Sequence, residues 1–428
     1  MRPTIFAKAS GAGRAGVAVY RISGPEAGRI LTALTGKPGK PRMTRRVAVR
    51  RSDGSLIDDG LALWFPGPHS FTGEDVAELQ LHGSLAVEEQ LSSAIAELGG
   101  VPAQPGAFTW RAFEHGKLDL TQVEGLADLL EADTALQHQQ AMAGYRGALR
   151  EKAEEWRGQL IAAMAQLDAA VDFPDEEDVP ELIEQRALPI VRELTSSIAQ
   201  VVEASRAAEK VAEGLSVAIL GPPNAGKSSL FNALIRDERS IVSPIPGTTR
   251  DVVSATVELG GLRVTFHDLA GIREETEDMI EAEGISRAKK LADQADLRIL
   301  CTPLGGSKAA WFDHYEQPGD LSVITKDDQL DAGGVTIQAE ESIARLRDRT
   351  EQILLSKASP GLAPTQRQRS LLLAALNQLE SFEAASLAAP ELGSEVLREA
   401  TAQLEYLLGR VAPDEVLDDI FSSFCIGK

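Results

Sequence analysis

The stretch GPPNAGKSSL, residues 221–230, matches the pattern G-x-x-x-x-G-K-[ST] at every fixed position. The apolar run SVAIL precedes it and the helically spaced SSLFNALI follows it, so the context is strand, loop and helix. Glycines at 221 and 226 let backbone N–H groups point at phosphate oxygens beside a helix N-terminus. The stretch therefore predicts a phosphate-binding loop inside an α/β domain.

Two side chains of this loop are expected to contact the phosphates and their metal ion. Lys227 reaches the terminal phosphates and is a predicted catalytic residue, and Ser228 offers a hydroxyl to the Mg²⁺ that bridges them. The metal neutralises the charge that develops as a phosphoryl group transfers. The residues of the loop predicted to bind nucleotide are Asn224, Ala225, Gly226, Lys227, Ser228 and Ser229.

Two later motifs follow in the order that GTPases use. GTTRD, residues 247–251, resembles a switch segment whose Thr249 hydroxyl completes the Mg²⁺ shell. The apolar run LRVTF then delivers Asp268 toward the metal and Gly271 toward the γ-phosphate, as in D-x-x-G. The residues predicted to bind nucleotide here are Ser243, Gly247, Thr248, Thr249, Asp268, Leu269, Ala270 and Gly271.

The base-recognition segment departs from the usual pattern. Thr325, Lys326 and Asp328 stand where GTPases carry N-K-x-D, and Asp328 can accept from the N1–H and amino group of guanine. Thr325 replaces the Asn whose amide ties the base to the phosphate loop, and lost hydrogen bonds of this kind cost about 1–3 kcal/mol. A second guanine-binding segment is reduced to residues 338–340. We therefore expect this chain to bind guanine nucleotides more weakly than GTPases that carry the usual segments.

Length and charge set outer limits. A chain of 428 residues holds two to four domains, and two cysteines are too few for a disulfide framework. The net charge of −21 argues against a nucleic-acid-coating protein. Residues 1–117 nevertheless carry 14 Lys and Arg against 11 Asp and Glu, so any RNA contact is expected near this third or through a partner protein. No apolar run approaches the ~20 residues of a membrane span, and a cytoplasmic protein is expected.

Periodicity divides the chain into four parts. Alternating strands such as RVAVRR, LIDDGLALWF and DVAELQLHG predict an α+β domain over residues 1–117. Helical spacing predicts a helical domain over 118–213 that resumes over 357–428, with the nucleotide-binding α/β domain, 214–356, inserted between them. Gly11, Gly13 and Gly16 spell G-x-G-x-x-G, but a strand follows, which favours a hairpin over a dinucleotide site. The acidic stretch DFPDEEDVP lacks the spacing of an EF-hand calcium loop and is interpreted as a solvated connection between helices.

The whole chain resembles the MnmE (TrmE) family of tRNA modification GTPases. The landmarks are GRAGVAVYRISG, ALWFPGPHSFTGEDVAELQ, PGAFTWRAFEHGKLDL, DFPDEE and the tail FSSFCIGK. The resemblance implies a dimerising N-terminal domain that binds tetrahydrofolate, as the 5,10-methylene or 5-formyl form, and a potassium-stimulated GTPase domain. It also implies work with the FAD-containing partner MnmG (GidA) on carbon 5 of the wobble uridine of tRNA.

The resemblance also assigns residues. The folate contacts would be Arg21, Glu78, Lys117 and Lys428. K⁺ would be held by Asn224, Ser243, Ile245 and Thr248, where its charge offsets that of the transition state. Glu281 is favoured as the catalytic acid that orients the attacking water, and Glu274, Glu275 and Glu277 stay open because this segment is one residue longer than in the family.

Cys425 and the class of function leave alternatives. A thiolate at Cys425 would need a nearby base or cation, and Lys428 is the candidate, so packing or a folate-site role is favoured over catalysis. The first alternative function is a potassium-dependent switch of the ribosome-assembly type, which has no reason to carry the N-terminal third and the CIGK tail. The second is a folate-dependent transferase with a vestigial GTPase, against which Lys227, Ser228, Thr249 and Asp268 argue.

Overall fold

The computed structural model describes residues 2–172, 186–236, 252–269, 288–306, 312–327, 335–336, 339–411 and 413–428. The chain forms two compact units, one of residues 1–127, 150–158 and 398–428, the other of residues 128–149 and 159–397. In these described ranges, no helix has the length and apolarity needed to cross a membrane.

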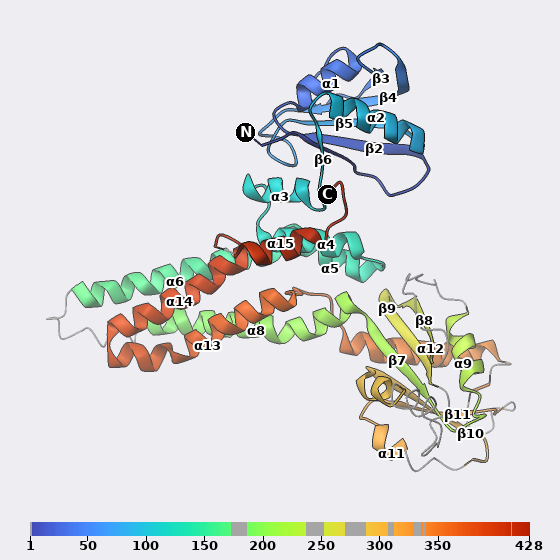
Figure 1. Ribbon diagram of the computed structural model, residues 1–428. Helices are drawn as coiled ribbons and strands as arrows, with labels where there is room; N and C mark the ends of the chain where they lie inside the picture. The colour runs from blue at the N-terminus through green and yellow to red at the C-terminus, as the bar shows by residue number, and fades with distance from the viewer. Residues whose placement is uncertain are drawn as a thin grey trace, which may run out of the picture. The chain divides into compact units, whose positions relative to one another are not determined.

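The N-terminal third is a six-stranded sheet in the order β3-β4-β5-β2-β1-β6. Helices α1 and α2 contribute Ile30, Leu31, Leu91 and Ile95 to one core with the strands, so both cover the same face of the sheet (Figure 1). The predicted α+β domain is confirmed, although the positions of its helices were not predicted. The elements are β1 (Ile5–Lys8), β2 (Ala15–Ser23), α1 (Ala27–Thr35), β3 (Arg45–Arg50), β4 (Leu56–Phe65), β5 (Val76–Gly83), α2 (Leu85–Glu97) and β6 (Val101–Pro102).

The glycine-rich segment between β1 and β2 is a strand connection. β1 pairs with β2 in antiparallel register, Ile5 opposite Ser23 and Lys8 opposite Tyr20. No helix begins in this segment, so a pyrophosphate would find no helix N-terminus there. The prediction of a hairpin in place of a dinucleotide-binding turn is confirmed.

The opposite face of this sheet meets α3 (Ala107–Glu114) and the end of the chain. Phe108 joins a small core with Ile5, Ala7 and Ala103. The last helix, α15 (Asp414–Ser422), places Phe421 against the Trp110 ring, with centroids 4.8 Å apart. Gly106 has a φ of 69° and would bring a Cβ to 2.2 Å from the Phe421 carbonyl oxygen, so the close approach requires glycine.

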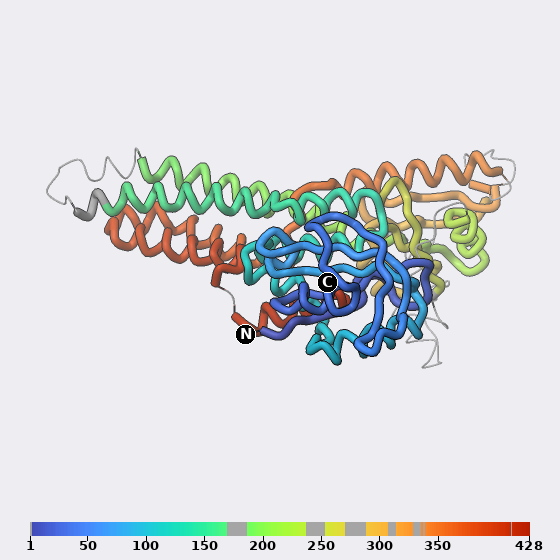
Figure 2. Tube along the Cα trace, turned by 90° about the horizontal axis from the view of Figure 1, so that it is seen from above, coloured from blue at the N-terminus to red at the C-terminus, as the bar shows by residue number. Residues whose placement is uncertain are grey.

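Helices from both sides of the nucleotide-binding domain pack together, as the inserted arrangement predicts. α8 and α13 lie side by side (Figures 1 and 2) and are joined by ion pairs Arg192–Glu383 at 2.9 Å and Arg369–Glu209 at 3.2 Å. The helix predicted from about residue 181 is described only from its later part. The helices are α4 (Leu120–Glu131), α5 (Ala135–Tyr145), α6 (Ala148–Asp172), α8 (Leu188–Glu213), α13 (Gln366–Ala388) and α14 (Pro390–Leu408).

The inserted domain is built on a five-stranded sheet in the order β11-β10-β7-β9-β8, parallel except for β8. One face is covered by α9 and α12, and Tyr315 of α11 packs in the core of the other face. The predicted P-loop α/β domain is confirmed. Its elements are β7 (Leu215–Leu220), α9 (Lys227–Ile235), β8 (Val252–Leu259), β9 (Leu262–Leu269), β10 (Leu297–Pro303), α11 (Phe312–Tyr315), β11 (Leu321–Thr325) and α12 (Glu340–Lys357).

Candidate functional site

The phosphate loop lies at the carboxyl edge of the parallel sheet. It leaves β7 at Leu220 and enters α9 at Lys227, which confirms the predicted strand, loop and helix. Gly226 has a φ of 87° and Asn224 a φ of 62°, so two residues take the left-handed conformation that turns N–H groups inward. At Gly221 a Cβ would lie 2.7 Å from the Cys301 carbonyl oxygen, which excludes any side chain. The loop is a preformed cradle for an anion.

Lys227 and Asp268 supply the charges of this cradle. Lys227 is buried, and its Nζ donates to the carbonyl oxygens of Gly221 and Pro222, each at 3.1 Å. Burial lowers the Lys227 pKa, and the Asp268 carboxylate partly opposes that shift. The buried Asp268 Oδ1 accepts no hydrogen bond from the described residues. A buried carboxylate oxygen that acts on the Lys227 ammonium, together with the exposed hydroxyl of the adjacent Ser228, fits a Mg²⁺ ion, for which oxygen ligands are preferred.

Thr325 corrects one prediction from the sequence. Its hydroxyl donates to the Ala225 carbonyl oxygen at 2.6 Å, and the side chain is buried at the end of β11. The next residue, Lys326, has a φ of 61°, and its Cε lies 4.0 Å from a Cβ built on Gly226. The tie from this position to the phosphate loop is therefore kept by the Thr hydroxyl, contrary to expectation, while the lost contact of the Asn amide with the base stays a prediction.

Some of the remaining residues predicted for the nucleotide site lie within the described ranges and others do not. Ala225 is buried in the loop, Ser229 is exposed in the first turn of α9, and Leu269 is buried at the end of β9. The others lie outside the described residues and stay predictions. These are Ser243, Ile245, Gly247, Thr248, Thr249, Ala270, Gly271, Glu274, Glu275, Glu277, Glu281 and Asp328.

The charged residues assigned to folate come together in the N-terminal unit. Arg21 and Glu78 are direct cross-strand partners in β2 and β5 and form an ion pair of 2.9 Å. Arg21 Nη1 donates to the Gly427 carbonyl oxygen at 3.5 Å, and Lys428 is close enough that Arg21 helps burial to lower the Lys428 pKa. Lys117 approaches the loop that carries Phe71, with its Cε 3.4 Å from a Cβ built on Gly73. Three of the four predicted contacts are thus brought together.

Aromatic rings and the tail complete the cluster. The Arg21 guanidinium carbon lies 5.6 Å from the Phe71 ring centroid and 5.7 Å from that of Phe108. The Phe108 N–H donates to the Lys428 carbonyl oxygen at 3.3 Å. Aromatic rings beside cations suit a flat, anionic ligand.

The two cysteines differ in their surroundings. Cys425 is exposed, and no hydrogen bond or ion pair to its thiol was found in the described part of the chain, so its role stays open. Cys301 is buried in β10, where burial raises its pKa to about 12, and it is a core residue as predicted.

Comparison with known proteins gives the family. The model of the family "GTP-binding protein TrmE N-terminus" matches residues 4–117, and that of "MnmE helical domain" matches residues 120–425. The tRNA modification GTPase MnmE of Maricaulis maris is 43% identical over the full length of both chains. The chain belongs to the MnmE (TrmE) family. The MnmE protein of Ruegeria pomeroyi is also 43% identical, over 99% of this chain and 100% of its own.

As a member of the MnmE family, the chain is a GTP hydrolase, which the phosphate loop supports independently. Among solved structures, Era of Aquifex aeolicus bound to GDP and aluminium fluoride is 25% identical over 32% of this chain and 46% of its own. Its TM-score of 0.23 is too low to add to the argument.

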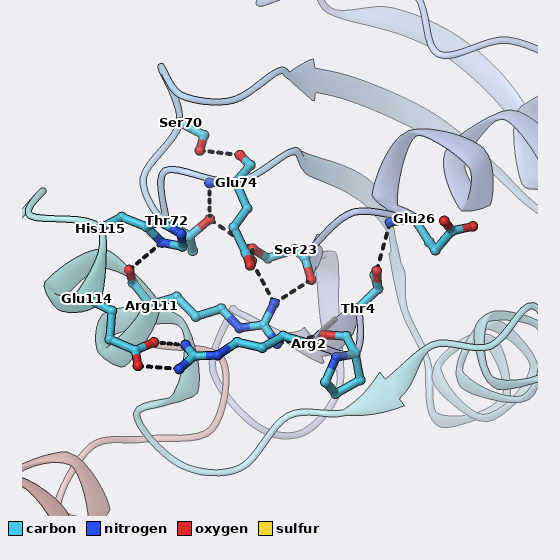
Figure 3. A network of polar contacts seen from close by, with 11 residues as sticks. Arg2, Thr4, Ser23, Glu26, Ser70, Thr72, Glu74, Arg111, Glu114 and His115 are labelled. Carbon is cyan, nitrogen blue, oxygen red and sulfur yellow. Dashed lines mark hydrogen bonds and ion pairs between the residues drawn. The ribbon is translucent and has the colours of Figure 1, made fainter.

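Sequence reasoning missed a buried polar network beside the charged cluster in this MnmE-family chain. Arg111 is buried and donates to Glu74 at 2.6 Å, to the Ser23 carbonyl oxygen at 3.0 Å and to the Pro3 carbonyl oxygen at 2.7 Å (Figure 3). Thr72 Oγ1 shares a hydrogen bond of 2.8 Å with Ser23. The network fixes the loop that carries Phe71. Apart from Pro3, its members lie within the quoted landmarks, but the sequence alone does not distinguish buried hydrogen-bond partners from surface charges.

Proposed function

We propose that this chain hydrolyses GTP in the modification of carbon 5 of the wobble uridine of tRNA, together with the FAD-containing partner MnmG (GidA). The observation that carries the proposal is that one chain holds both a phosphate cradle with Lys227 and Asp268 and a charged, aromatic cluster around Arg21. A nucleotide switch alone has no use for the second cluster. Work on tRNA places the protein in the cytoplasm.

The residues of the GTP site divide the work. Backbone N–H groups of the loop and Lys227 hold the phosphates, while Ser228 and Asp268 would hold Mg²⁺, directly and through its outer shell. When bound, the metal neutralises charge on the transferring phosphoryl group. Lys227 exchanges the carbonyl oxygens of Gly221 and Pro222 for phosphate oxygens, which restores a charged partner to a buried ammonium.

Potassium stimulation is the finer part of this proposal. The left-handed Asn224 lies at the start of the loop that the phosphates occupy, and its side chain is exposed and therefore available to an ion. A fixed cation there would offset charge that develops in the transition state. GTP hydrolysis should be faster in K⁺ than in Na⁺, and Asn224→Ala should remove the difference; equal rates of the unaltered chain in the two salts would contradict the proposal.

The Arg21 cluster is proposed to bind reduced folate. Arg21 Nε and Nη2 both contact Oε1 of Glu78. Within the described residues, Oε2 of Glu78 has no hydrogen-bond partner. This oxygen can therefore accept a hydrogen bond from an amino or ring N–H group of a pterin. Arg21, Lys428 and Lys117 would face the carboxylates of the glutamate tail. Calorimetry with 5-formyltetrahydrofolate tests this: the unaltered chain should bind it and Arg21→Ala should lose it, and equal affinity of the two would contradict the assignment.

We also propose a homodimer formed through the N-terminal domain, on the family resemblance alone. The molar mass from light scattering should be about twice that of one chain.

The function as a whole is tested by deleting the gene and measuring wobble-uridine modification by mass spectrometry. Loss of the carbon-5 group is expected. Unchanged tRNA, particularly with a ribosome-assembly defect, would favour the switch GTPase instead.

A further inference from the structure

The edge of the N-terminal sheet carries a run of positive charge. Residues 37–51, KPGKPRMTRRVAVRR, hold seven Lys and Arg and no Asp or Glu, in a chain whose net charge is −21. The run covers the connection after α1 and the whole of β3, which is the edge strand because β4 is its one neighbour in the sheet. The seven cations are Lys37, Lys40, Arg42, Arg45, Arg46, Arg50 and Arg51, and we call them the basic edge.

Most cations of the basic edge have no carboxylate partner among the described residues. In the described parts of the chain, Arg51 is the one member with a carboxylate partner, Glu97 at 3.8 Å. Arg42, Arg45 and Arg50 donate to backbone carbonyl oxygens, which fix their positions and leave their charge in place. Lys37, Lys40 and Arg46 are exposed with no such contact. On β4, Asp58 lies opposite Val49 and Asp59 opposite Ala48, and the Asp58 carboxylate already pairs with His82.

The geometry places part of the basic edge on the same face as the proposed folate contacts. Val47 and Val49 face the core under α1 and α2, so Arg46 projects from the other face of the sheet. Glu78 and Arg21 also project from that face, since their neighbours Ala77, Leu79, Tyr20 and Ile22 belong to the same core. β5 is the third strand counted from this edge, two strand spacings from β3, so Glu78 lies on the order of 10 Å across the sheet from β3.

We propose that the basic edge binds the phosphate backbone of the tRNA substrate and holds the RNA beside the folate cluster. Unpaired, exposed Lys and Arg side chains release counterions when they contact phosphates, which supplies sequence-independent affinity. The net charge of the rest of the chain is negative, so the basic edge is the stretch whose charge most favours contact with RNA. The inference rests on the proposed function, because tRNA as substrate belongs to that proposal.

The test uses the full chain and an unmodified tRNA transcript with uridine at the wobble position. Lys37, Lys40 and Arg46 are changed together to Gln, and Arg206, Arg345 and Arg349, exposed cations elsewhere, are changed to Gln in a control with the same loss of three charges. Fluorescence anisotropy is recorded from about 50 to 200 mM KCl. The basic-edge variant should bind about 10- to 100-fold more weakly at 100 mM KCl, and its slope of log K against log[KCl] should fall by about 2.

Other outcomes overturn the inference. Equal affinity and equal slope for the two variants would show that the lysines and arginine do not meet phosphate. Self-association of the basic-edge variant with unchanged tRNA affinity would show that the charges protect an edge strand from pairing. Unchanged tRNA affinity with lost binding of the flavoprotein partner would make the edge a protein surface. Failure of the unaltered chain to bind tRNA would also overturn it, while the wobble-uridine measurement judges the function separately.

Discussion

The phosphate loop and the Arg21 cluster are built in opposite ways. The loop takes its cradle from neighbouring residues 221–228, held by glycine conformations and backbone hydrogen bonds. The Arg21 cluster collects side chains from residues 21, 78 and 428, and its rings from residues 71 and 108. A site formed by adjacent residues keeps its geometry as long as those residues and the sheet that supports them are folded. A dispersed site also needs every distant segment to stay docked, so the two should respond differently to the same kind of change.

Removing the loop cation should have the largest effect and should stay local. Lys227→Ala deletes the buried ammonium that stabilises charge on the phosphates, and loss of one such donor lowers turnover by on the order of 10²- to 10³-fold. Steady-state GTP hydrolysis measures the effect. Affinity for 5-formyltetrahydrofolate, measured in parallel, should not change. A comparable loss of folate binding would show that the two sites are not independent.

Truncating the anchor of the tail should act on the dispersed site. Phe421 is buried against Trp110 and lies near the Phe424 ring, so Phe421→Ala should cost about 3–5 kcal/mol in the free energy of unfolding of the N-terminal unit. Folate affinity should fall with it, because the tail places Lys428. Denaturant unfolding and calorimetry report the two effects, with GTP hydrolysis as the control. Folate binding at full strength in this variant would contradict a role for the tail.

The hydroxyl of Thr325 should have a smaller effect on the local site. Thr325→Val keeps the shape and removes the buried donor to Ala225, which costs about 1–2 kcal/mol, or roughly 5- to 30-fold in GDP and GTP affinity alike. Thr325→Ser keeps the hydroxyl and should bind nearly as well as the unaltered chain. Titration of fluorescent GDP and GTP gives the values. If Val and Ser variants bind equally, the hydrogen bond does not position the base segment.

The smallest expected effect is that of pH on the folate affinity of the Arg21 cluster. Burial and Arg21 lower the Lys428 pKa below its usual 10.5, so this ammonium loses its proton at lower pH than an exposed lysine. An anionic folate prefers the charged form, so affinity should be full below the lowered pKa and decline as pH rises through it. Calorimetry across alkaline pH measures the decline. Lys428→Met should flatten it, and an unchanged profile in that variant would assign the titration to another group.

The contrast also explains what the sequence could predict. The phosphate loop, its strand and its helix were predicted correctly because the necessary residues are adjacent and each has a local conformational reason. The tie between Thr325 and Ala225 spans 100 positions, and the length of a side chain cannot be weighed without the backbone that presents it. The Arg21 cluster was found through the family landmarks alone. The Arg111 network and helix α15 were not predicted, since their partners meet only in the folded chain.

The central claim is that the phosphate loop and the Arg21 cluster of one chain serve one modification. The direct measurement is complementation of the gene deletion by three versions of the chain, followed by mass spectrometry of wobble uridine: the unaltered sequence, Lys227→Ala and Arg21→Ala. We predict that the unaltered chain restores the carbon-5 group, and that each variant, although folded and still able to bind the other site's ligand, restores little of it. Full modification with Arg21→Ala would contradict the account.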